Sequence, residues 1–437
     1  MIVSPLKEFL GTNRLSPRAQ GLVHRFILLA SLQTSLYLIS STFYVLYVLE
    51  YVGFLTLGAL LAVSVVLQAI LDYPSGVMGD WIGQRWILTI SFIGYGLSYG
   101  LLIQANSFMD LLLVYVLVAF ANSQESGALQ SWFDNNFKVV SNEIDSDQNF
   151  YQEFLGKYQS IVGFLGANVI IFGGFIATLL FREIVFLIQS VGMFIIAGLC
   201  FILVDNFSEV PRVERSYRNY INLAQEGIKF AFLTKHMAFL VISICLWNMI
   251  WQIWVKMILF PIYFGYTGSD AGAGILRFIG WISNSILAAK AGMWSIKLNF
   301  RRWVPRLNLI IIISFFGFFT LLVTFYPVEN SFNVLPIILL FCYIFIFLSL
   351  NNLFLILRQR LVFDLVPNSI RTSVYSLFPT LTLLIEAPFL VISGSIIEWY
   401  GIPVVLLLLM IIGVISSGSM YVSITALSSE ENGEKRD

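Results

Sequence analysis

Long apolar stretches, separated by short polar segments, run through almost the whole chain. A helix needs about 20 mostly apolar residues to cross the hydrocarbon core of a bilayer. We predict such a membrane-spanning helix over each of twelve stretches: residues 22–49, 54–78, 86–105, 109–137, 152–180, 183–205, 237–264, 270–295, 305–326, 334–363, 371–397 and 402–426. The pattern therefore predicts an all-α polytopic membrane protein.

The longest polar connection separates the sixth and seventh spans, so the chain is predicted to consist of two halves of six helices each. The predicted order is a cytoplasmic N-terminal segment (1–21), a first six-helix bundle (22–205), a linker (206–236), a second six-helix bundle (237–426) and a cytoplasmic tail (427–437). Within the linker, apolar residues recur at helical spacing from Tyr217 to Ala231. This spacing predicts an amphipathic helix on the membrane surface.

Composition supports the membrane assignment independently. Hydrophobic residues make up 58% of the chain and charged residues 11%, with a mean hydropathy of +0.84. A soluble domain carries about 25% charged residues. The formal net charge is zero, so nothing in the charge pattern favours nucleic-acid binding.

Basic residues predict the orientation. If the N-terminus is cytoplasmic, only three of the 25 Lys and Arg residues fall away from the cytoplasmic side: Arg182, Lys256 and Arg277. Short cytoplasmic loops of membrane proteins carry an excess of Lys and Arg. We therefore expect a multi-pass protein of the cell membrane with both termini in the cytoplasm.

A polar, glycine-spaced segment from Asp72 to Arg85 joins the second and third spans and predicts a tight turn. It resembles the loop signature of the major facilitator superfamily, Gly-x-x-x-Asp-x-x-Gly-x-Arg. The matching residues are Gly76, Asp80, Gly83 and Arg85. Asp72, Pro74 and Ser75, just before them, are similar to the form found in drug-efflux-like members. The alternative is an ordinary turn between two helices.

Two further segments carry this resemblance. Residues 126–134, which end in Asp134, are similar to the end of the fourth span in efflux-like members. Between the eighth and ninth spans, Gly292 and Arg301 keep the spacing of Gly76 and Arg85, as a repeat in the second half would predict. The fifth span departs from the pattern, because Val169 and Ile170 stand where many antiporters of the superfamily have Gly-Pro.

The resemblance implies two six-helix bundles around a central cavity, built from repeats and working by alternating access. It also implies a role for the motif loop. Asp80 and Arg85 are expected to form a cytoplasmic latch, with Asp134 as a third partner. Opening and closing of this latch would bias the conformational equilibrium.

Two carboxylates lie halfway along predicted spans: Glu125 in the fourth and Glu386 in the eleventh. A charge near the bilayer centre costs at least ~2.5 kcal/mol on insertion scales, so it usually has a function. Both are candidates to carry a coupling proton, because burial favours the protonated form of a carboxylate. The alternative is that they form structural ion pairs with Lys256 or Arg277.

The seventh span carries a polar stripe of Asn248, Gln252 and Lys256 beside an aromatic stripe that includes Trp247 and Trp251. Such a wall suits an amphipathic organic substrate. Arg277 in the eighth span is a further substrate candidate, and Gln33 and Tyr37 in the first span form a possible second cavity face. The alternative for the aromatic residues is packing between helices.

An enzyme is not indicated. The sequence has two histidines, no His, Cys and carboxylate set at metal-ligand spacing and no phosphate-binding loop. We therefore expect no metal, no cofactor and no ATP hydrolysis. The sequence predicts a secondary active transporter, foremost one that couples efflux of amphipathic compounds to protons. The alternatives are uptake of an organic, possibly anionic, solute and a transporter-like sensor without flux. The expected partners are a small-molecule substrate, a coupling proton and the lipid bilayer.

Overall fold

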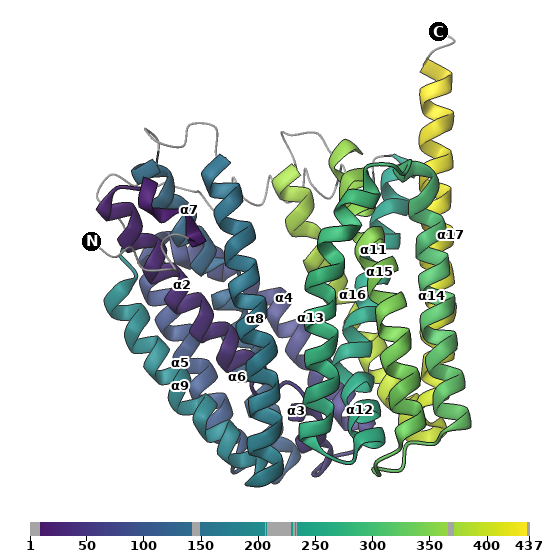
Figure 1. Ribbon diagram of the computed structural model, residues 1–437, viewed down its shortest axis with the longest axis horizontal. Helices are drawn as coiled ribbons and strands as arrows, with labels where there is room; N and C mark the ends of the chain where they lie inside the picture. Colours follow the sequence, from purple (N-terminus) through teal and green to yellow (C-terminus); the bar gives the residue numbers. More distant parts are fainter. Residues whose placement is uncertain are drawn as a thin grey trace. The chain divides into compact units, whose positions relative to one another are not determined.

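The computed structural model describes residues 9–141, 149–205, 207, 229, 232, 234–365 and 371–434, and within these ranges it is helical, without strands (Figure 1). Ten helices of the described chain are long and apolar enough to span a membrane. The other two predicted spans correspond to α2 (Pro17–Leu38) with α3 (Tyr44–Leu49), and to α5 (Gln84–Leu102). The prediction of an all-α, multi-span membrane protein is confirmed.

The chain forms two compact units. Unit 1 comprises Met1–Tyr44 and Leu67–Arg215, and unit 2 comprises Val45–Val66 and Ser216–Asp437. Unit 1 contains the short η1 (Thr12–Arg14), α2 and α5, followed by α6 (Phe108–Glu125), α7 (Ala128–Ser141), α8 (Asn149–Leu179) and α9 (Arg182–Leu203). The division falls inside α4 (Phe54–Ile82), whose first part belongs to unit 2.

Unit 2 contains most of α3 and the remaining helices. These are α11 (Lys235–Ile253), the π-helical η2 (Trp254–Ile258), α12 (Leu259–Thr267), α13 (Asp270–Ser295), α14 (Phe300–Phe325), α15 (Val334–Leu365), α16 (Arg371–Tyr400) and α17 (Ile402–Glu434). The linker helix predicted within 206–236 falls almost wholly outside the described residues.

Small residues allow the helices of unit 1 to pack closely, as is typical of helices in membranes. α5 packs against both α6 and α9, while α2 contacts α7, α8 and α9. At the α5–α9 contact, the Ser190 hydroxyl donates to the Gly96 carbonyl over 2.7 Å. A Cβ atom on Gly173 of α8 would collide with the backbone carbonyl of Ile39. These contacts keep the polar side chains of α2, α5 and α6 close to one another.

Small residues allow close helix packing in unit 2 as well. Ser243 of α11 and Ser416 of α17 each donate a hydrogen bond to the other's carbonyl, over 2.8 and 2.9 Å. The first part of α4 crosses α16 at two glycines, because a Cβ on Gly58 or Gly394 would collide with backbone of the opposite helix. This close crossing explains why that part of α4 belongs to unit 2.

Three predicted spans are less regular than expected. The first is divided into α2 and α3. The fourth is interrupted after Glu125, where Gly127 adopts a left-handed conformation with φ of 72°, which favours glycine. The seventh contains a π-helical turn at Trp254–Ile258, and Pro261 follows it without an N–H to donate. The spans predicted at 22–49, 109–137 and 237–264 are therefore each built from more than one helical segment.

The turn between the second and third spans is shorter than predicted. α4 continues to Ile82 and α5 begins at Gln84, so Gly83 alone connects them, with φ of 88°. Most of the glycine-spaced segment is therefore helical. The second glycine of the signature is required because this backbone conformation is strained for any residue with a side chain.

Candidate functional site

The interruption of the fourth span places Glu125 at the end of α6 and beside α2. The Gln33 amide of α2 donates a hydrogen bond to Glu125 Oε1. Glu125 is partly exposed and forms no ion pair within the described part of unit 1. The sequence had assigned Gln33 and Glu125 to different roles, and the fold brings them together.

A second amide lies one helical turn away from Glu125. Tyr37 of α2 donates to Asn122 Oδ1 over 3.0 Å, and Tyr95 of α5 donates to the same oxygen. The rings of Tyr37 and Tyr95 pack edge to face, with centroids 4.9 Å apart. We call Gln33, Tyr37, Tyr95, Asn122 and Glu125 the unit 1 cluster. The sequence had not identified Asn122 or Tyr95, although both are polar groups inside apolar spans.

The π-helical turn of the seventh span carries Lys256, and this residue pairs with Glu386 of α16. The Lys256 ammonium lies 2.7 Å from Glu386 Oε1, and the Glu386 side chain is 0% exposed. The second oxygen, Glu386 Oε2, is buried without a hydrogen-bond partner among the described residues. The ion pair predicted as the alternative role of Glu386 is therefore present. π-helical turns frequently mark functional sites.

The aromatic stripe of the seventh span packs within unit 2. The Trp247 ring lies 4.4 Å from that of Phe354, and the Trp251 ring lies 4.7 Å from that of Phe315, measured between centroids. Trp247 is 3% exposed. Packing between helices, the alternative role predicted for these rings, accounts for both positions. In the polar stripe, Gln252 is exposed and therefore remains accessible.

Two arginines inside the spans of unit 2 are held by neutral groups. The Arg277 guanidinium lies 5.9 Å from the ring of Phe260 and 6.0 Å from that of Trp281. The Arg358 guanidinium of α15 donates to Asn248 Oδ1 over 3.4 Å. Neither has a carboxylate partner in the part of the chain that the structure describes. Arg358 lies near the polar end of its span, so its position in the sequence alone does not mark it as a substrate candidate.

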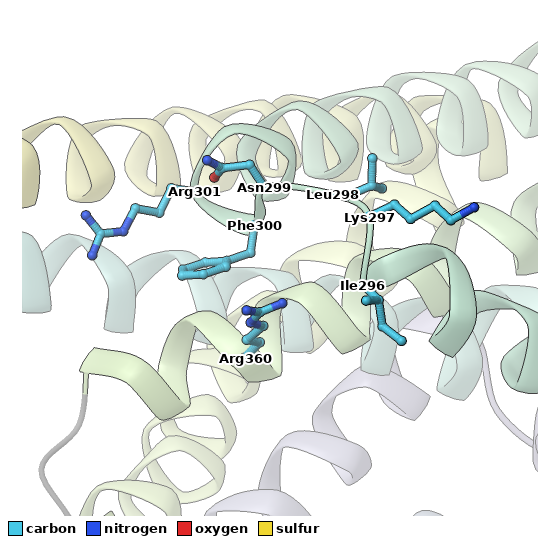
Figure 2. Close-up of a pocket in the computed structure, with 7 residues that line it drawn as sticks. All are labelled: Ile296, Lys297, Leu298, Asn299, Phe300, Arg301 and Arg360. Atoms are coloured by element: carbon cyan, nitrogen blue, oxygen red, sulfur yellow. The ribbon is translucent and has the colours of Figure 1, made fainter.

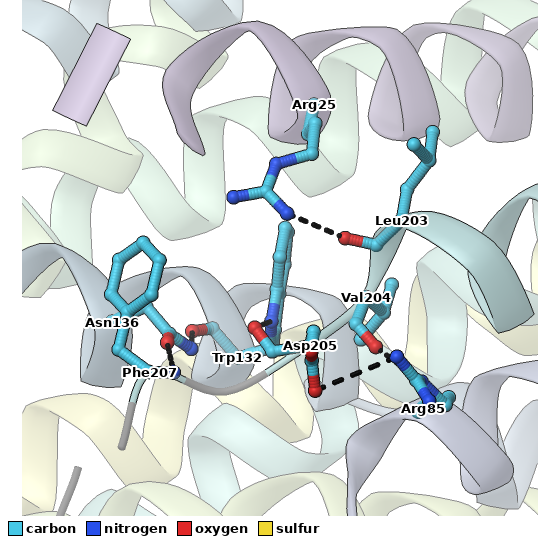
Figure 3. Close-up of polar contacts among 8 residues, drawn as sticks. All are labelled: Arg25, Arg85, Trp132, Asn136, Leu203, Val204, Asp205 and Phe207. Carbon is cyan, nitrogen blue, oxygen red and sulfur yellow. Dashed lines mark hydrogen bonds and ion pairs between the residues drawn. The ribbon is translucent and has the colours of Figure 1, made fainter. Parts of the chain in front are cut away.

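Arg85 of the motif binds the end of α9 (Figure 3). Its Nε donates to the Val204 carbonyl over 2.8 Å, and its Nη2 lies 3.5 Å from the Asp205 carboxylate. Arg25 donates to the Leu203 carbonyl at the same helix end over 3.1 Å. Cations stabilise helix C-termini by binding the carbonyls that have no partner within the helix.

Two side chains of α7 hold the chain that leaves α9. The Trp132 indole donates to the Asp205 carbonyl over 3.0 Å, and the Phe207 amide donates to Asn136 Oδ1 over 2.8 Å (Figure 3). Together with Arg85, they fix the first residues after α9 against unit 1.

Asp134 has partners other than the expected one. Its Oδ1 accepts hydrogen bonds from Gln130 and Tyr151, and a contact with Arg85 is not among those described. Burial and the carboxylate both raise the pKa of Tyr151, so this hydroxyl stays protonated and remains a donor at neutral pH. The Asp80 side chain and the surroundings of Gly76 lie outside what the structure describes, and the pairing of Asp80 with Arg85 stays a prediction.

The described residues contain no group of His, Cys, Asp and Glu side chains that could hold a metal ion. The three cysteines are unpaired.

Comparisons with known proteins identify the fold. No protein-family model and no curated protein matches the sequence. Among solved structures, a mutant of the nucleoside transporter NupG aligns with a TM-score of 0.73 at 15% identity, over 92% of this chain and 99% of that one. The D-xylose-proton symporter aligns with a TM-score of 0.65 at 15% identity, over 91% and 97% of the two chains.

A bacterial homologue of the human lysosomal transporter Spinster also aligns, with a TM-score of 0.62 at 14% identity, over 94% of this chain and 95% of that one. These neighbours are transporters and none is an enzyme. At these identities the likeness concerns the fold, and the chain has the fold of major-facilitator-type transporters.

Proposed function

We propose that this protein is a secondary active transporter of a small organic solute, and that Glu125 carries a coupling proton. The fold supports the transporter class. The observation that supports the role of Glu125 is its position at the end of an interrupted membrane helix, hydrogen-bonded by an amide and not by a cation. Interrupted helices commonly hold the substrate and coupling-ion sites of transporters.

The partner of Glu125 suits a group that alternates between two protonation states. An amide carries both donor and acceptor atoms, so Gln33 can donate to the carboxylate and, after rotation, accept from the carboxylic acid. A Lys ammonium in place of Gln33 would stabilise only the charged carboxylate, because an ammonium has no acceptor atom. Protonation at Glu125 can therefore change the charge of the unit 1 cluster without leaving a buried group unpaired.

We propose efflux of amphipathic compounds as the leading direction, on the resemblance of the motif loop to that of drug-efflux-like members. Uptake of a solute with an anionic group is the second candidate. It is favoured by Arg277 and Arg358, whose guanidinium groups face rings or an amide within unit 2. The remaining alternative, a sensor without flux, predicts ligand binding without transport.

We also propose that both termini lie in the cytoplasm and that Asp80 and Arg85 form a latch on that side. Placement in the cell membrane with cytoplasmic termini is supported by the distribution of Lys and Arg. With Arg85 anchored at the end of α9, a latch would depend on Asp80 reaching Arg85 from the end of α4.

Flux measurements in proteoliposomes test this proposal. A panel of amphipathic cations, neutral compounds and organic anions is added under an imposed pH gradient, and proton movement is followed with a trapped pH-sensitive dye. We expect Glu125→Gln to reduce substrate-linked proton flux roughly tenfold or more, within the usual range of coupling between two ligands. Exchange of substrate without a gradient should persist, because the variant imitates the protonated carboxyl.

The matched control is Glu329→Gln, the same substitution at an exposed carboxylate between α14 and α15. It should transport like the unaltered protein. Normal pH-driven flux in Glu125→Gln would remove Glu125 from the mechanism. Binding of solutes without flux in the unaltered protein would favour the sensor.

A further inference from the structure

The connection between α13 and α14 forms an open cavity of about 520 Å³ (Figure 2). Six of its lining residues are the consecutive residues 296–301, and the seventh is Arg360 of α15. A volume of ~300–1,000 Å³ accommodates a small ligand or a headgroup. None of these residues belongs to the unit 1 cluster or to the Lys256–Glu386 pair.

The polar lining of this cavity is basic. Lys297, Arg301 and Arg360 supply its charged groups, and the sequence from 295 to 306 contains no acidic residue. The Arg360 guanidinium stacks over the Phe300 ring, 5.1 Å from its centroid. A ring holds this guanidinium in place while leaving its N–H donors available, because a cation–π contact uses the face of the group.

Apolar side chains adjoin the basic ones. At the end of α13, Met293 is 62% exposed, Trp294 46% and Ile296 77%. Tryptophan is enriched where membrane helices meet the headgroup region. The chain therefore changes from exposed apolar to basic within one helical turn, which matches the change from acyl chain to phosphate along a phospholipid.

We propose that this cavity binds the phosphate headgroup of an anionic phospholipid. The phosphate lies against the Arg360 guanidinium, while Lys297 and Arg301 add positive charge on either side of it (Figure 2). An acyl chain lies along Ile296 and the end of α13. Basic pockets at the cytoplasmic membrane surface recognise anionic lipids in this way. A soluble phosphate compound would gain nothing from the exposed apolar residues. The inference does not depend on transport, since it rests on unit 2 alone.

The test is a lipid titration of the purified protein in detergent, followed by thermal unfolding. Phosphatidylglycerol should raise the melting temperature, and phosphatidylcholine should not. The triple variant Lys297→Gln, Arg301→Gln, Arg360→Gln should bind phosphatidylglycerol roughly 100-fold more weakly, because each basic group near an anionic lipid contributes a factor of about five. The single variant Arg360→Gln should bind phosphatidylglycerol about fivefold more weakly. It replaces the triple variant in the test if the triple variant does not fold.

The matched control is Lys290→Gln, Arg302→Gln, Arg306→Gln, which removes the same charges from exposed positions outside the lining. This control variant should keep most of its affinity for phosphatidylglycerol. An equal loss in both triple variants would mean a general effect of charge and would overturn the cavity as the site. Equal stabilisation by glycerol phosphate or by phosphatidylcholine would overturn the anionic lipid as its occupant.

Discussion

Glu125 and Glu386 are the same residue type inside membrane spans, but their surroundings differ. Glu125 is partly exposed and accepts a hydrogen bond from the Gln33 amide. Glu386 is fully buried and pairs with the Lys256 ammonium at 2.7 Å. An amide can satisfy either protonation state of a carboxyl group, whereas an ammonium favours the charged state. Under the proposed function, the partner of each carboxylate, rather than its position halfway along a span, would separate the proton carrier Glu125 from the ion-paired Glu386.

The local backbone differs as well. Glu125 lies at the end of α6, just before the left-handed Gly127, while Lys256 lies in a π-helical turn. In both units an irregular backbone brings a polar side chain to a neighbouring helix. Glu386 nevertheless keeps one oxygen without a partner in the described chain, so its pair with Lys256 is incompletely satisfied. Each contrast between the unit 1 cluster and the Lys256–Glu386 pair can be tested by substitution.

The largest effect is expected at Lys256. Lys256→Met leaves the fully buried Glu386 carboxylate without its cation, which should destabilise the protein by about 3–5 kcal/mol. Adding Glu386→Gln removes the uncompensated charge and should restore most of the loss. Equilibrium denaturation in detergent measures both variants. Lys290→Met, at an exposed position of α13, is the control, and equal stability of Lys256→Met and this control would contradict a structural pair.

A smaller effect is expected at the break in the fourth span. Gly127→Ala should cost about 1–2 kcal/mol, because a left-handed conformation brings the new Cβ too close to the following carbonyl. It should also weaken solute-linked proton flux if the break positions Glu125. Gly156→Ala in the helical interior of α8 is the matched control, since a Cβ there meets nothing within 4 Å. That variant should be neutral or slightly stabilising. If Gly127→Ala leaves the stability unchanged, the left-handed conformation at this position is not required for the fold.

The smallest effect concerns Asn122. Tyr37→Phe and Tyr95→Phe each remove one of the two donors to Asn122 Oδ1 and should cost about 0.5–1.5 kcal/mol apiece. The double variant leaves this oxygen without either donor and should cost more than the sum of the single losses. Thermal unfolding in detergent measures all three. Strict additivity would show that the two tyrosines act independently of their shared acceptor.

The sequence by itself determined the class of protein and most of its helices. Twelve apolar stretches predicted the spans because a bilayer accepts few backbone arrangements other than a helix. It also marked Glu125, Lys256, Arg277 and Glu386, because charges inside such stretches are rare. The glycine-spaced motif predicted the turn after the second span, and the structure narrowed that turn to Gly83.

Only the tertiary structure decided which of these groups meet. Gln33 reaches Glu125, and Lys256 reaches Glu386, across 92 and 130 residues of sequence. Arg85 binds the carbonyl of Val204 at the end of α9. Every residue has a backbone carbonyl, so a sequence motif cannot identify which one an arginine will bind. The length of an apolar stretch is a local property that the bilayer requires of each span separately. The pairing of polar groups depends on how helices cross and where they are interrupted, and this is set by packing between segments far apart in the chain.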